Sequence, residues 1–154
     1  MHLHFVYLLA LLLLAATVHA AALQQRTLGR VAEIVLLYLL VGYCGIPMLA
    51  VSVWVLVSPE RAAAGFGFGA ARPLLDFFGW AYLGMSLLSL LALRYRGAFL
   101  VAPVVVWTVY LGGATLVHLQ ESHGRALEIF TSHGLIAVLL VGASIACGAW
   151  RVRT

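Results

Sequence analysis

The chain has little charge of either sign. Only 9% of its 154 residues are charged, none is lysine, and only five are acidic. Soluble domains carry roughly 25% charged residues. A chain of this length cannot hide 64% hydrophobic residues inside one water-soluble core, so most of its apolar side chains must face lipid. The scarcity of charge excludes an ordinary soluble domain and predicts an integral membrane protein.

Several sequence motifs that mark other classes are also missing. The nine arginines are spread over the ends of apolar runs and form no single patch, which argues against a nucleic-acid partner. Cys44 and Cys147 give neither a disulfide framework nor a CxxC motif. No HExxH metal motif, haem-attachment motif or spaced nucleophile and base occurs, so an enzyme is the less favoured class.

Long apolar runs dominate what is present. A run of about 20 apolar residues crosses a membrane as a helix. The sequence therefore predicts an all-α fold, a single transmembrane bundle over residues 1–154. Its five helices are expected at about 3–23, 31–57, 74–93, 98–119 and 127–150. The first run alternatively resembles a cleaved secretory signal, which would leave four helices, but no Lys or Arg precedes it.

Local signals refine this outline. Pro47 lacks an amide hydrogen and predicts a kink in the second helix. Ser58 and Pro59 are typical of a helix start, and residues 58–73 are expected to form a loop with one short helix at the headgroup layer. Most tryptophans stand near run ends and are expected to anchor the bundle at the interface: Trp54, Trp80, Trp107 and Trp150.

The arginines predict the orientation. With the N-terminus outside, five helices place six arginines on one side: Arg26, Arg30, Arg94, Arg96, Arg151 and Arg153. The other side receives three arginines and four acids. Positive residues favour the cytoplasmic side, so we expect a multi-pass membrane protein with its N-terminus outside and its C-terminus inside. Cleavage of the first run would reverse this arrangement.

This topology gathers polar residues on the outer side. His118 and Glu121 are three residues apart on one helical face, and an imidazole that donates to a carboxylate is held in a metal-binding tautomer. We predict a ligand site formed by His118, Glu121, His133 and Asp76. The metal ligands within it would be His118, His123, His133 and Glu121. Zinc, copper, haem or a quinone-like molecule would suit such a site.

A simpler interpretation stands beside this one. Histidines at helix ends lie in a polar layer, where water or a carbonyl satisfies them. On the opposite side, His19 and Glu33 are close in the sequence and at a similar depth in the membrane. They are expected to meet as a structural pair. The alternatives to ligand binding are an assembly partner or homo-oligomer, docked through small residues such as Gly84 and Gly142, and a small-solute or ion transporter or channel.

Two segments resemble a known family. Residues 79–88, Gly-Trp-Ala-Tyr-Leu-Gly-Met-Ser-Leu-Leu, precede a helix that ends Leu-Gly-Gly-Ala-Thr-Leu-Val-His at residues 111–118. Together they resemble an uncharacterised bacterial family of small integral-membrane proteins, classed only as a domain of unknown function and similar in outline to DoxX-like bundles. The resemblance implies the helical membrane fold and a bacterial inner-membrane location, and it implies no particular activity.

Overall fold

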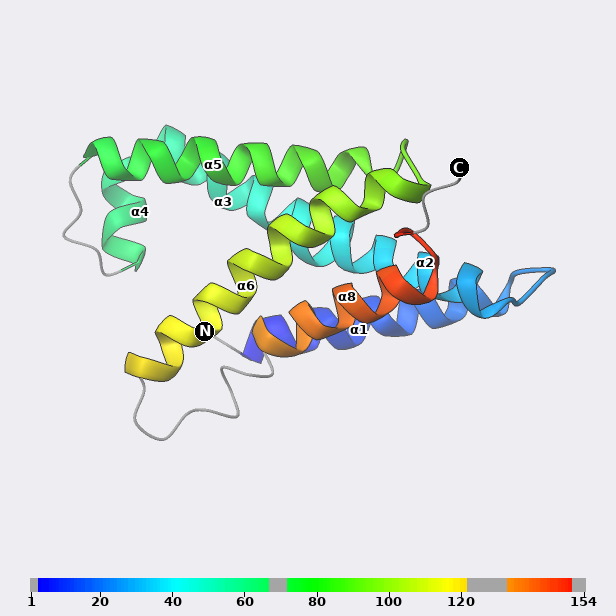
Figure 1. Cartoon of the computed structure of the whole chain (residues 1–154). Helices are drawn as coiled ribbons and strands as arrows, with labels where there is room; N and C mark the ends of the chain where they lie inside the picture. Colours follow the sequence, from blue (N-terminus) through cyan, green and yellow to red (C-terminus); the bar gives the residue numbers. More distant parts are fainter. Residues whose placement is uncertain (1–2, 67–71, 122–132, 151–154) are drawn as a thin grey trace.

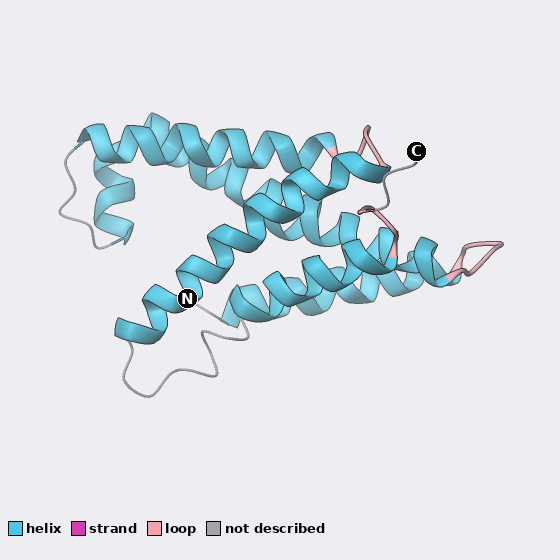
Figure 2. Ribbon diagram, viewed as in Figure 1, coloured by secondary structure: helices cyan, strands magenta, loops and turns pink. Residues whose placement is uncertain are grey.

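A computed structural model describes residues 3–66, 72–121 and 133–150. These residues form helices and connecting turns, and no strand occurs among them (Figure 2). The all-α prediction is thus confirmed. The helices are α1 (Leu3–Ala21), α2 (Leu28–Leu37), η1 (Tyr38–Gly45), α3 (Ile46–Val57), α4 (Pro59–Phe66), α5 (Arg72–Leu91), η2 (Gly97–Leu100), α6 (Val101–Glu121) and α8 (Leu135–Ala146).

The long helical segments run back and forth along the molecule. In Figure 1, α1, the continuous α2–η1–α3 segment, α5, α6 and α8 follow one another in alternating directions. Three segments are long and apolar enough to cross a membrane: Leu28–Val57, Arg72–Leu91 and Gly97–Gln120. The apolar stretches Val6–Ala21 and Leu135–Ala146 are shorter. The structure therefore supports a membrane protein with three candidate spans.

The second segment begins three residues earlier than predicted. Thr27 has an extended backbone, and its hydroxyl accepts a hydrogen bond from the Arg30 backbone N–H at 3.4 Å. This is the usual way in which threonine caps a helix. Arg26, just before it, donates to the Ala21 carbonyl at the end of α1. The connection between α1 and α2 is short, and the two helices pack side by side.

The predicted break near Pro47 takes the form of a π-helix. Over Tyr38–Gly45 the helix widens, and the Ile46 N–H bonds to the Val41 carbonyl five residues back. Pro47 follows as the second residue of α3. Proline clashes with the carbonyl four residues earlier in a regular helix, and a wider turn relieves that clash.

The centre of the bundle is built around Trp107 of α6, which is 1% exposed. Its indole N–H donates to the Ser89 hydroxyl of α5 at 2.6 Å. The prediction that the tryptophans are mostly interfacial is therefore wrong for Trp107, whereas the other three are exposed. Large buried neighbours come from four further elements: Leu36, Leu39, Leu40, Leu100 and Leu140.

Helix α5 lies at the edge of the bundle. Figure 1 shows it beside α3, and its most extensive packing is against that helix. The close contact occurs at Gly79, where an added Cβ would lie 2.7 Å from the Leu56 side chain. At Gly84 and Gly142 an added Cβ would meet nothing within 4 Å. α5 therefore packs closely on α3 at Gly79, whereas Gly84 on the same helix is left open.

The short helix predicted after Ser58 is confirmed as α4. Ala62 on this helix is fully buried and packs with Val55 and Leu75, which ties α4 to α3 and α5. Glu60 and Arg72 form an exposed ion pair of 4.0 Å beside it. The headgroup location of this segment stays a prediction.

Candidate functional site

The structure brings two of the predicted site residues together. His118 lies in the last turn of α6, and His133 lies two residues before α8 begins. Their ring centroids are 5.5 Å apart and the rings are tilted by 48°. His118 is exposed and His133 half-buried. We call His118 and His133 the histidine pair. They meet because α6 ends, and α8 begins, at the same end of the molecule (Figure 1).

The other predicted ligands do not complete this site within the described residues. Asp76 is half-buried in the second turn of α5, which Figure 1 places on the far side of the bundle from the end of α6. No group of three His, Cys, Asp or Glu that could hold a metal ion occurs in the described part of the chain. Glu121 ends α6, but its side chain and the whole of His123 lie outside the described residues.

The separation of the two rings restricts the ligand. A coordinating imidazole nitrogen stands about 2 Å from a zinc or copper ion, so its ring centroid stands about 3 Å away. Two axial rings on opposite faces of a haem iron would therefore have centroids about 6 Å apart, and two rings at a tetrahedral angle about 5 Å. The observed 5.5 Å lies midway between these two values, so it fits two imidazoles that share one metal atom, either a bare ion or a haem iron.

The predicted pairing of His19 with Glu33 is wrong. The Glu33 carboxylate instead faces Arg96, with Oε1 and Nε 3.8 Å apart. His19 packs edge-on against Tyr38, with ring centroids 6.0 Å apart. The position of each residue along its predicted helix correctly placed both near one end of the bundle. It did not reveal which neighbouring helix each side chain faces.

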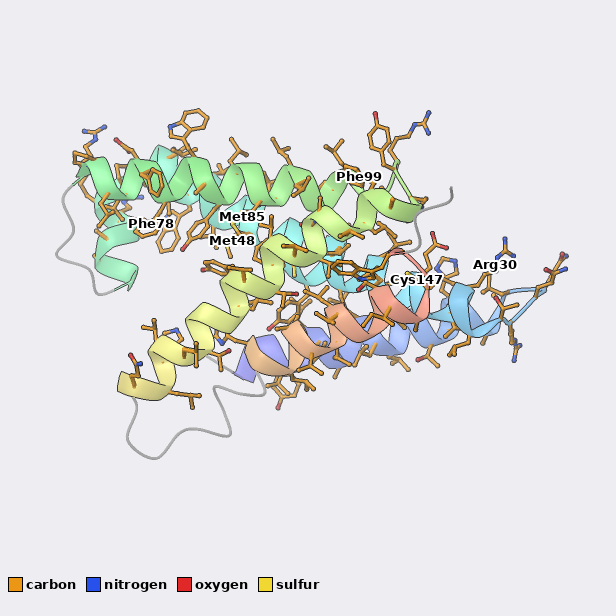
Figure 3. All side chains as sticks on the ribbon, in the orientation of Figure 1. Arg30, Met48, Phe78, Met85, Phe99 and Cys147 are labelled. Atoms are coloured by element: carbon orange, nitrogen blue, oxygen red, sulfur yellow. The ribbon has the colours of Figure 1, made fainter. Side chains whose placement is uncertain are left out.

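An aromatic row between α5 and α6 was missed at the sequence level. Phe78 stacks on Tyr82 at 6.0 Å, Tyr82 meets Tyr110 at 5.9 Å, and Tyr110 meets Trp107 at 5.6 Å. The Tyr110 hydroxyl donates to the Tyr82 hydroxyl at 3.2 Å. Helical spacing could have indicated the first and last pairs. The contact between helices has no local signal. Figure 3 shows Phe78 at the start of this row.

The polar residues in the middle of the bundle mostly bond to their own helices. The hydroxyls of Ser52, Ser86, Ser89, Thr115 and Ser144 each donate to a backbone carbonyl three or four residues earlier. The Thr108 hydroxyl is buried without a hydrogen-bond partner among the described residues. The hydrogens of the five bonded hydroxyls are thus used within single helices, while the Ser89 and Ser144 oxygens also accept from the indoles of Trp107 and Trp150.

The fold defines a small all-helical protein with three helices able to cross a membrane. The sequence model of DUF6790, a family of unknown function, matches residues 3–147, and the chain belongs to this family. The resemblance to a domain of unknown function is thereby confirmed. No curated protein and no solved structure matches the chain.

Proposed function

We propose that this chain is a multi-pass inner-membrane protein that binds a transition-metal ion at the histidine pair. The observation that carries the proposal is the 5.5 Å separation of two imidazoles that are 15 residues apart in sequence. Imidazole nitrogens suit zinc and copper. Glu121 and His123 follow His118 within five residues and are the further ligands we propose. The role is that of a binding or accessory protein, not an enzyme.

The arginine distribution supports an outer-side location for this site. Arg26, Arg30, Arg94 and Arg96 all lie at the end of the bundle opposite to the histidine pair, and we call this the arginine end. The positive-inside rule makes it cytoplasmic. Five membrane passes, with α1 and α8 as the first and last, would then place the N-terminus outside and the histidine pair at the outer surface.

The first test is the metal content of protein purified in mild detergent without chelator and then supplied with about one equivalent of Zn²⁺ or Cu²⁺. We expect wild-type protein to retain the ion. His118→Ala and His133→Ala should each weaken binding at least about 100-fold, because even the loss of an outer-shell partner costs about 10–100-fold. Elemental analysis after desalting measures the difference.

His19→Ala provides the matched control. His19 lies at the arginine end against Tyr38, so its removal should leave metal content unchanged. Equal metal retention by wild type and both site variants would disprove the proposal. A Soret absorption band in the purified protein would show that the bound group is haem and would overturn the assignment to a metal ion alone.

A second candidate function, docking onto another copy or a larger membrane complex, has one observation in its favour. Gly84 and Gly142 are exposed and contact no side chain of their own chain at the Cβ position. Small residues on such faces let helices of different chains approach closely.

Enlarging these glycines tests this role. If they lie in an interface, Gly84→Leu and Gly142→Leu should reduce the protein to a monomer, measured by light scattering in detergent. Val109→Leu, at an exposed position on α6 that already carries a branched side chain, serves as the control. An identical mass for all four proteins would exclude an interface at these two glycines.

A further inference from the structure

The arginine end contains more positive charge than its own acids neutralise. Arg30 lies in the first turn of α2, and Arg94 and Arg96 lie in the turn between α5 and α6. All three are exposed. Glu33 is the only acid at this end in the described part of the chain, since Glu60 and Asp76 lie at the other.

One contact within the chain ties together the two elements that carry these arginines. The ion pair between Arg96 and Glu33, at 3.8 Å, links the turn to α2. Arg30 precedes Glu33 by three residues and so shares its face of the helix. Arg94 stands 6.0 Å above the Tyr95 ring. One carboxylate therefore stands against three guanidinium groups.

The same end has the aromatic residues of a membrane interface. Tyr95 is 52% exposed and Trp150 is 47% exposed, and the Trp150 indole donates to the Ser144 hydroxyl at 2.8 Å. Exposed tyrosine and tryptophan concentrate at the headgroup level. Figure 3 shows Arg30 beside the end of α8, near Cys147, so the charges and the aromatic residues lie at the same end.

We propose that Arg30, Arg94 and Arg96 bind the phosphate headgroups of anionic phospholipids around this end of the bundle. Guanidinium groups match phosphate oxygens in a two-pronged geometry, and cytoplasmic leaflets supply anionic lipid at this depth. Charge complementarity selects this occupant, because zwitterionic lipids bring a positive group with each phosphate. The inference is independent of the metal proposed at the histidine pair.

The test compares lipids added to the protein in non-ionic detergent. Phosphatidylglycerol should raise the midpoint of thermal unfolding by about 5 °C, as expected for a ligand well above its dissociation constant. Phosphatidylcholine with the same acyl chains should leave it unchanged. Inorganic phosphate at the same concentration should also have no effect; an equal rise with phosphate would identify a free-anion site and overturn the lipid assignment.

Variants assign the effect to these residues. The combined Arg30→Gln, Arg94→Gln and Arg96→Gln protein should lose the phosphatidylglycerol shift, and Arg94→Gln alone, at an exposed turn position, should reduce it if the triple variant does not fold. The control combines Arg61→Gln and Arg72→Gln at the opposite end and should keep the full shift. An undiminished shift in the arginine-end variants, or an equal loss in the control, would refute the proposal.

Discussion

Replacing Trp107 with alanine is expected to lower the free energy of unfolding by about 3–5 kcal/mol, the usual cost of removing a buried tryptophan. Trp107 is 1% exposed and meets Tyr110 edge-on at 5.6 Å. In a membrane protein the loss arises from missing van der Waals contacts and from a cavity that neighbouring side chains cannot fill. Unfolding by sodium dodecyl sulfate, followed by circular dichroism, would measure it.

The hydrogen bond to Ser89 makes this prediction sharper. Ser89→Ala leaves the buried indole N–H without its acceptor and should cost about 1–2 kcal/mol. In a Trp107→Phe background the same change should cost almost nothing, because phenylalanine has no N–H to satisfy. An equal cost of Ser89→Ala in both backgrounds would show that the 2.6 Å contact does not stabilise the fold.

Much of the helical outline could be predicted because the length of an apolar run is a strong signal. The predicted helix at 74–93 corresponds to α5 at Arg72–Leu91, and that at 98–119 to η2 and α6. The π-helix at Tyr38–Gly45 could not be predicted, since periodicity cannot distinguish helix types in a uniformly apolar run. The burial of Trp107 was missed for a related reason: every face of its helix is apolar.

The candidate site was predictable to the same degree. Alternating helices return His118 and His133 to one end of the bundle, and the packing of α6 against α8 brings the two rings together there. Asp76 was assigned to that end by the same reasoning, but topology does not specify on which side of the bundle a helix lies. α5 packs mainly on α3, which leaves Asp76 away from the histidine pair. The position of a residue along the length of the bundle can be predicted from the sequence, whereas its position around the bundle depends on how the helices pack.

Packing is also the basis of the second large effect, expected for Gly45→Leu. Gly45 ends the π-helix where it presses against α5. An added Cβ would lie 3.1 Å from the Leu40 carbonyl oxygen and 3.3 Å from the Ser89 Cβ. A leucine must displace one of these, and overpacking of this kind typically costs about 1–3 kcal/mol.

This substitution is expected to act on two helix contacts at once. Displacing Ser89 moves the acceptor of the Trp107 indole, so the cost of Gly45→Leu should include that of Ser89→Ala, and the two changes should not add. Gly113→Leu, where an added Cβ meets nothing within 4 Å, is the matched control and should change stability little. The measurement is the free energy of unfolding of each single variant and of the Gly45→Leu, Ser89→Ala double variant. Additive costs would mean that η1 does not hold Ser89 in place beneath Trp107.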